Sequence, residues 1–199
     1  VEKLGAKARA IRMGDPFDPA TQLGPVISAK QRDRVLTYAG YGRQEGARNV
    51  AGGEAAVLPG LEGGFFVQPT VFADVRADMR IFQEEVFGPF TSITPFSDEA
   101  EALRLANDSP FGLAAAIRTR DVTRAHRVAA KVKAGLVWIN DHHRLDPASP
   151  WGGVGDSGIG REFGVESFND HFDVKSVMLP TVDRRFDWYR DTSTQTRLN

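Results

Sequence analysis

Residues 136–162 read LVWINDHHRLDPASPWGGVGDSGIGRE, and the other elements of the chain can be ordered around them. The first four residues are apolar and β-prone, which predicts a buried strand. The remainder predicts a long loop, because it holds two prolines and five glycines and shows no helical or alternating pattern. Long loops in compact chains are uncommon unless they are functional, so we expect this one to line a site. The alternative is a surface loop that merely covers the ring of Trp151.

The composition is that of an ordinary globular protein. Of 199 residues, 41% are hydrophobic and 26% are charged, and the net charge is −1. This balance gives no electrostatic reason to expect nucleic acid or an anionic membrane as a partner. No apolar run approaches the roughly 20 residues of a transmembrane helix, and no secretory signal opens the chain. We therefore expect a cytoplasmic protein with neither membrane nor nucleic-acid partners.

Two features point to a piece of a longer polypeptide. The sequence starts at Val1 and enters a helical pattern at once. It contains no cysteine, which excludes disulfides, thiolate metal sites and a cysteine nucleophile within these residues.

Apolar periodicity predicts five helices, at residues 2–13, 29–47, 99–107, 121–133 and 161–168. Ser28 and Gln31 have the spacing of a capping box for the second helix, and Ser97 or Asp98 is expected to cap the third. The basic residues of helix 29–47 are predicted to form a solvated face. Gly135 is predicted as the C-terminal cap of helix 121–133.

Strands are predicted at residues 65–75 with an interruption at Pro69, and at 90–96, 113–118, 136–139 and 172–179. The order strand, helix, strand, helix, strand predicts an α/β fold, with a layered, partly parallel sheet flanked by helices. Strand 172–179 is predicted to be a C-terminal β arm for oligomerisation, since a bare edge invites pairing.

Five segments, in this order, resemble motifs of the NAD(P)-dependent aldehyde dehydrogenases. They are GDP (14–16) with GP (24–25), GFFVQPTV (64–71), EEVFGP (84–89), AND with FGLAA (106–115), and SPWGG with SGIGRE (149–162). The resemblance implies that residues 1–170 are the part of a catalytic domain that follows the nucleophilic cysteine. It implies that residues 171–199 are the oligomerisation arm and tail of a homodimer or homotetramer.

The activity implied by the resemblance is oxidation of an aldehyde to a carboxylic acid. In the family, a thiolate attacks the aldehyde carbon, hydride passes to the nicotinamide, and activated water releases the acid. The family's cysteine, general-base glutamate and dinucleotide-binding domain all precede the matched segments. We therefore expect the 199 residues alone to be inactive. NAD is the expected cofactor, although these residues do not distinguish it from NADP.

The resemblance also assigns roles to individual residues. Glu85 matches a glutamate that binds the nicotinamide ribose, and its alternative role is that of a carboxylate in a turn. Phe87 matches an aromatic residue that packs beside the nicotinamide, and its alternative role is that of a core residue. Glu162 matches a glutamate that relays protons in some members, or else is purely structural. Arg161 and Asp173 match positions that form an ion pair near the subunit interface.

The loop after the 136–139 strand matches the loop that shapes the substrate tunnel. Trp151 is expected to stack on an aromatic aldehyde or to attract a quaternary ammonium group, as in the betaine aldehyde branch. His142 and His143 are expected to hydrogen-bond the aldehyde substrate. We expect no metal site, because adjacent histidines point apart and no third ligand has a suitable spacing.

Two other functions remain open from the sequence. One is a non-catalytic homologue that acts in assembly or regulation, which the missing cysteine would suit. The other is a CoA-acylating relative, which would release an acyl-CoA in place of a free acid.

Overall fold

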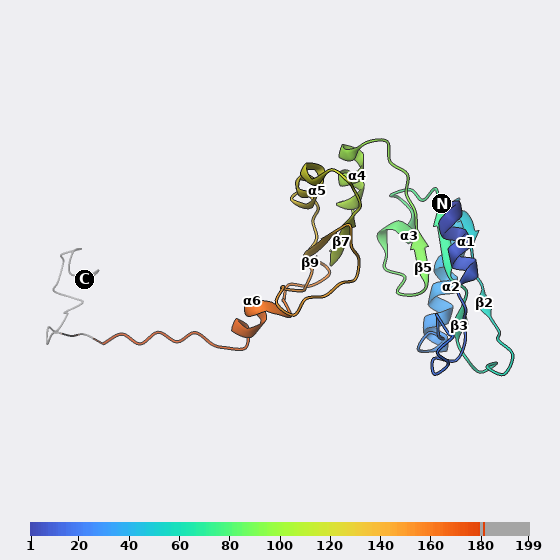
Figure 1. Ribbon diagram of the computed structural model, residues 1–199, viewed down its shortest axis with the longest axis horizontal. Coiled ribbons are helices and arrows are strands. Elements are labelled where there is room, and N and C mark those ends of the chain that lie inside the picture. Colours follow the sequence, from blue (N-terminus) through green and yellow to red (C-terminus); the bar gives the residue numbers. More distant parts are fainter. Residues whose placement is uncertain (180, 182–199) are drawn as a thin grey trace, which may run out of the picture.

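The computed structural model describes residues 1–179 and residue 181. Both helices and strands occur along it, as Figure 1 shows. The helices are α1 (Glu2–Ala10), α2 (Ala29–Gln44), α3 (Arg80–Gln83), α4 (Glu99–Ala106), α5 (Val122–Ala129) and α6 (Gly164–Asn169). The strands are β1 (Arg48–Ala51), β2 (Ala55–Ala56), β3 (Phe66–Val67), β4 (Thr70–Ala73), β5 (Phe90–Ser92), β6 (Phe111–Gly112), β7 (Ala114–Ile117), β8 (Leu136–Ile139) and β9 (Val154–Gly155). None of the helices within the described residues has the length and apolar character to cross a membrane.

Three helices begin at side chains that cap them. The Ser28 hydroxyl accepts from the backbone N–H of Gln31 at the start of α2, so this half of the predicted capping box is confirmed. Asp98 caps α4, in agreement with one of the two predicted caps, and Asp121 caps α5. Each cap satisfies a backbone N–H that the first helical turn leaves without a partner.

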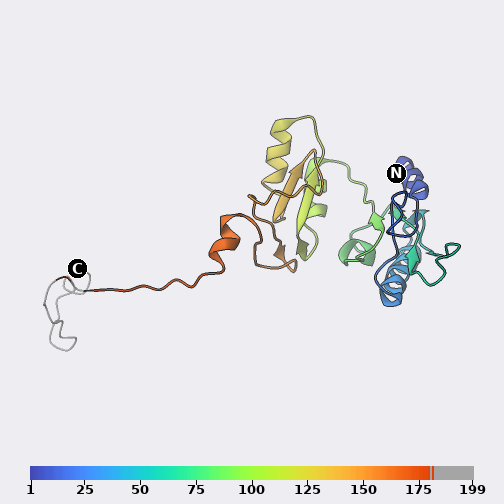
Figure 2. The same ribbon diagram turned by 60° about the horizontal axis from the view of Figure 1, so that its bottom comes forward.

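The strands of the described residues form four small sheets, whereas a single layered sheet was expected. β1, β4 and β5 make one sheet, in which β4 runs parallel to β5 and antiparallel to β1. β7 and β8 form a parallel pair joined through α5, which lies against β7 (Figure 2). Ala125 of α5 is buried. β2–β3 and β6–β9 are short antiparallel pairs. The α/β character and the parallel pairing are therefore confirmed.

The hydrophobic core lies in the first half of the chain. α2 contributes Val35, Tyr38 and Ala39, which pack against β3, β4 and the segment before α3. All four residues of β4 are buried. Among the described residues after position 96, Ala125 is the one apolar side chain buried to this degree. The second half thus has few buried side chains to hold it within the single chain.

The predicted strand at residues 172–179 is not formed. Residues 173–179 carry no regular structure and are exposed, and Figure 1 shows them extending away from α6. A strand requires a hydrogen-bonded neighbour, and none of the described residues supplies one. Residues 172–179 therefore form no β arm in the part of the chain that the structure describes, and the role of the arm in oligomerisation stays a prediction. The rest of the predicted 171–199 segment lies largely outside the described residues.

Gly135 does not cap α5, which ends at Ala129 with Ala130 as its C-cap. Its backbone N–H instead donates to the Gly112 carbonyl. A Cβ atom at this position would overlap the carbonyl oxygen of Gly152. Gly135 therefore allows the start of β8 to lie directly against the end of the long loop.

We expect Gly135→Ala to destabilise the protein by roughly 1–3 kcal/mol, because the backbone must shift to admit the methyl group. The matched control is Gly40→Ala, in the middle of α2, where no atom other than the backbone of the helix itself lies within 4 Å of the added methyl group. This control should stabilise by up to about 1 kcal/mol, since alanine has the higher helix propensity. Urea unfolding of the complete gene product measures the free energy of unfolding of both variants. Equal changes in this free energy would contradict the close contact between Gly135 and Gly152.

Candidate functional site

Residues 84–88 form a turn between α3 and β5, which we call the 84–88 turn. Its central residue, Val86, is buried at 8% exposure and belongs to the core. The residues on either side of it, Glu85 and Phe87, are exposed. Phe87 has 76% of its surface accessible and is therefore not the core residue considered as an alternative. The turn thus presents a carboxylate and an aromatic ring on either side of a buried valine.

Side chains of α2 bind the backbone of this turn. Arg34 donates from its guanidinium to the carbonyl oxygen of Glu85, at 2.6 Å. Gln31 donates from its side-chain amide to the carbonyls of Val86 and Phe87. Phe87 has a φ of 57°, in the left-handed region that side chains with a Cβ rarely adopt. The basic face of α2, predicted to be solvated, therefore carries contacts to the turn.

A third α2 residue binds the side chain of the first turn residue. The buried Tyr38 hydroxyl donates to the Glu84 carboxylate at 2.6 Å. This hydrogen bond, together with burial, raises the pKa of Tyr38 above its ordinary value. The phenol therefore stays neutral, and able to donate, through the ordinary pH range.

Glu85 lies where two hollows of the surface meet. One, of about 600 Å³, is lined by the 84–88 turn together with residues of α3 and β5. The other, also about 600 Å³, runs from Glu84 and Glu85 to β6, β7 and Ser157. The Glu85 carboxylate makes no hydrogen bond or ion pair with the described residues, so its oxygens are available to a ligand. An acceptor carboxylate beside an exposed ring in an open hollow suits a ligand with paired hydroxyls and a flat ring.

The loop after β8, residues 140–153, folds around Trp138. The Trp138 ring lies 5.6 Å from that of His142, 5.8 Å from that of His143 and 6.1 Å from that of Trp151. Its indole N–H donates to the carbonyl of Arg144 at 2.8 Å. We call Trp138, His142, His143 and Trp151 the aromatic cluster. The predicted substrate residues are thus brought together, around a tryptophan that was predicted only as a strand residue.

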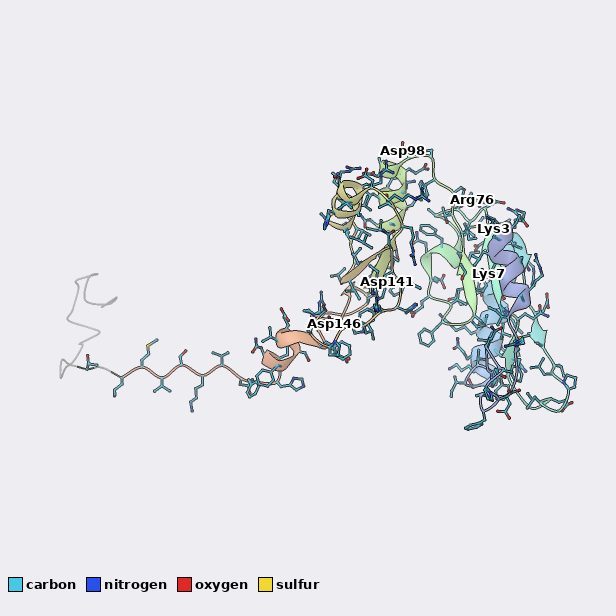
Figure 3. The ribbon with its side chains drawn as sticks, viewed as in Figure 1. Lys3, Lys7, Arg76, Asp98, Asp141 and Asp146 are labelled. Atoms are coloured by element: carbon cyan, nitrogen blue, oxygen red, sulfur yellow. The ribbon has the colours of Figure 1, made fainter. Side chains whose placement is uncertain are left out.

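The far end of the loop is held by its backbone. Trp151 and Glu162 exchange two backbone hydrogen bonds, each of 2.7 Å. Arg161 donates to the carbonyl oxygens of Gly153 and Gly160. Figure 3 labels Asp141 and Asp146, which mark the course of the same loop beside α6. Trp151 is half-buried and the Glu162 side chain is exposed.

Within the described residues, the residues predicted to bind the cofactor and the substrate fall into two groups that no hydrogen bond or aromatic contact joins. Glu85 and Phe87 lie on the 84–88 turn, and the histidines and Trp151 lie in the aromatic cluster. Arg161 contacts carbonyl oxygens and forms no ion pair with the exposed Asp173 in the described chain, so their interface role stays a prediction.

Sequence reasoning missed Trp138 and the contacts of α2. A tryptophan at the end of a strand and before a His pair was one available signal. The spacing of Gln31, Arg34 and Tyr38 along one helix face was another. In the part of the chain that the structure describes, no three His, Asp or Glu side chains gather as a metal ion would require.

Comparison with known proteins gives a consistent result over nearly the whole described chain. Residues 1–177 match the model of the "Aldehyde dehydrogenase family". A betaine aldehyde dehydrogenase of Brucella melitensis is 49% identical over 179 residues, which are 90% of this chain and 37% of that relative. The chain thus spans little more than a third of the length of this curated relative.

Two solved structures show the same fold. A betaine aldehyde dehydrogenase double mutant of Staphylococcus aureus, solved in complex with NAD+, has a TM-score of 0.91 and 41% identity; the match covers 95% of this chain and 38% of that one. An NAD+ complex of aldehyde dehydrogenase from Bacillus cereus has a TM-score of 0.86 and 44% identity, covering 90% of this chain and 36% of that one.

Proposed function

The chain belongs to the aldehyde dehydrogenase family, and we propose that it forms the cofactor-binding turn and the substrate-binding loop of an NAD+-dependent enzyme that oxidises aldehydes to carboxylic acids. The observation that carries this proposal is the 84–88 turn, where Glu85 and the exposed ring of Phe87 flank the buried Val86. Two relatives of the same fold were solved in complex with NAD+, which favours NAD+ over NADP+.

The residues of the turn fit NAD+ chemically. The Glu85 carboxylate can accept hydrogen bonds from both hydroxyls of a ribose, and it has no partner among the described residues. The exposed Phe87 ring offers an apolar face to the nicotinamide. When bound, NAD+ supplies the hydride acceptor that protein side chains lack. The role of this chain is then to orient the cofactor, through Glu85 and Phe87.

The aromatic cluster favours, as the substrate, an aldehyde that carries a quaternary ammonium group. Trp151 and Trp138 present indole rings 6.1 Å apart, and indole faces attract such cations. His142 and His143 supply ring nitrogens that can hydrogen-bond the substrate. The similarity to betaine aldehyde dehydrogenases favours the same substrate class. We keep the proton-relay role of Glu162 as a proposal that rests on motif position.

The test is NADH formation by the complete gene product with betaine aldehyde, benzaldehyde and a short aliphatic aldehyde. We expect NADH with betaine aldehyde as the preferred substrate, and none from the 199-residue chain alone, because it contains no cysteine. A folded gene product that forms no NADH would overturn the proposal in favour of the assembly module. Acyl-CoA as the product would instead indicate the CoA-acylating alternative.

The homodimer or homotetramer and the cytoplasmic location stay predictions. The apolar side chains of residues 172–179, exposed in the single chain, are consistent with burial against another subunit. Light scattering of the complete gene product tests the predicted oligomeric state, and a monomer at micromolar concentration would contradict it.

A further inference from the structure

One face of α2 contacts each residue of the 84–88 turn. Its side chains at positions 31, 34, 35 and 38 follow the i, i+3, i+4, i+7 spacing that places residues on one side of a helix. We call these four residues the α2 stripe. Three of them make hydrogen bonds to the turn: Gln31 to the carbonyls of Val86 and Phe87, Arg34 to that of Glu85, and Tyr38 to the Glu84 carboxylate.

The fourth residue of the stripe fits beneath the end of the turn. Val35 is fully buried, and a Cβ atom added to Gly88 would lie 2.5 Å from its methyl carbon. The glycine therefore allows the turn to lie directly on α2. Arg34 adds a second contact within the stripe, since its guanidinium carbon lies 4.9 Å from the centroid of the Tyr38 ring.

The conformation of the turn depends on these contacts. The left-handed backbone at Phe87 is unfavourable for a residue with a Cβ and requires support from its surroundings. The Phe87 ring gives little support, because it is 76% exposed. The Gln31 amide, by contrast, binds the carbonyl of this same residue. Val86 fixes the middle of the turn, and the stripe fixes the peptides on both sides of it.

We propose that Gln31 and Arg34, assisted by Tyr38, are positioning residues that hold the Glu85 carboxylate and the Phe87 ring in the arrangement that binds NAD+. This inference rests on the proposed function and extends it to the residues that set the geometry of the cofactor turn. Gln31 and Arg34 act on the main chain of the turn. Replacing their side chains should therefore make the turn more mobile, although the variant still contains the Glu85 carboxylate and the Phe87 ring.

The test compares Arg34→Met with Arg32→Met in the complete gene product. Arg34 is exposed, so its variant is expected to fold. Arg32 lies two residues away on the same helix, but pairs with Asp33 and faces Phe65. We expect Arg34→Met to raise the Kd for NAD+, measured by calorimetry, about tenfold, since small displacements of a binding group are costly. Arg32→Met should change it less than about twofold, as surface substitutions usually do.

A second measurement reports on the turn without cofactor. Chymotrypsin cleaves after exposed phenylalanines in mobile backbone, and cleavage after Phe17, which is 94% exposed in a separate loop, serves as an internal reference. In NAD+-free protein we expect Arg34→Met and Gln31→Leu to raise cleavage after Phe87 relative to Phe17 severalfold. Arg32→Met should leave this ratio unchanged.

The Glu85→Gln variant separates the two levels of the proposal. If it weakens NAD+ binding while Arg34→Met and Gln31→Leu do not, the positioning role is overturned and the cofactor role of Glu85 stands. A raised cleavage ratio with unchanged NAD+ affinity in the stripe variants would likewise overturn it, because the contacts would then be structural only. If Glu85→Gln leaves NAD+ affinity unchanged, the proposed cofactor turn fails, and this inference fails with it.

Discussion

Replacing Glu85 by glutamine is expected to raise the Kd for NAD+ of the complete gene product by roughly tenfold to a hundredfold. The substitution keeps the shape of the side chain and removes its charge and one of its acceptor oxygens. Hydrogen bonds to a charged group contribute about 1.5–3 kcal/mol, and each 1.4 kcal/mol is a factor of about ten in affinity. The carboxylate has no partner among the described residues, so its loss should leave the fold unchanged.

The matched control is Glu84→Gln, the same substitution one residue earlier. The Glu84 carboxylate accepts a hydrogen bond from the buried Tyr38 hydroxyl, and a glutamine side-chain oxygen can still accept that hydrogen bond. We therefore expect a change in NAD+ affinity of less than about threefold, the size of a perturbed neutral hydrogen bond. Calorimetry measures both variants. Equal losses of affinity would mean that the overall charge of the turn matters, and not the position of Glu85.

Glu85→Gln should weaken cofactor binding without changing the reactivity of the cysteine nucleophile. A thiolate-directed reagent measures this reactivity, and we expect the rate of thiol modification in NAD+-free enzyme to be the same in the variant and the parent enzyme. The reason is that Glu85 lies on a turn fixed by α2 and Val86. A large fall in thiol reactivity would show that the substitution had disturbed the site as a whole.

Much of the local structure could be predicted from short-range patterns. The predicted caps at Ser28 and Asp98 are contacts between residues three apart, so the sequence contains both partners. The strand break at Pro69 and the buried pattern of β4 are equally local. The helix at residues 2–13 was predicted three residues too long, because helix ends fray and depend on contacts outside the helix.

Elements that depend on distant partners were predicted less well. β1 begins with the polar residues Arg48 and Asn49 and carries a register shift against β4, so no alternating pattern identifies it. The strand at residues 172–179 has the right composition but no neighbour among the described residues. Sequence composition gives the tendency to form a strand, whereas the partner decides whether it forms.

The candidate site shows the same division. Glu85, Phe87 and Trp151 were predicted because they lie in recognisable motifs. Arg34 was assigned to a solvated face, because nothing local shows that it reaches a carbonyl 51 residues away. Trp138 was read as a core strand residue, yet its ring is the centre of the aromatic cluster. Roles that act through another residue are visible only when the fold has brought the two together.

Replacing Trp151 by alanine is expected to remove the preference for a charged substrate. A cation over an indole face is stabilised by about 2 kcal/mol when water is excluded, which corresponds to roughly thirtyfold in kcat/KM. The sharpest comparison uses betaine aldehyde and its neutral tert-butyl analogue, which has nearly the same shape. In Trp151→Ala we expect kcat/KM for betaine aldehyde to fall by this factor and kcat/KM for the neutral analogue to fall much less.

Two control variants distinguish the charge effect from a loss of packing. Trp151→Phe keeps an aromatic face with a weaker attraction for cations, so it should retain part of the preference. Trp138→Phe keeps a ring against Trp151 but loses the N–H that binds the Arg144 carbonyl. It should therefore lower kcat/KM for both aldehydes alike by loosening the 140–153 loop. If Trp151→Ala also lowers kcat/KM equally for both aldehydes, then Trp151 only shapes the loop. Residues outside the aromatic cluster must in that case recognise the quaternary ammonium group.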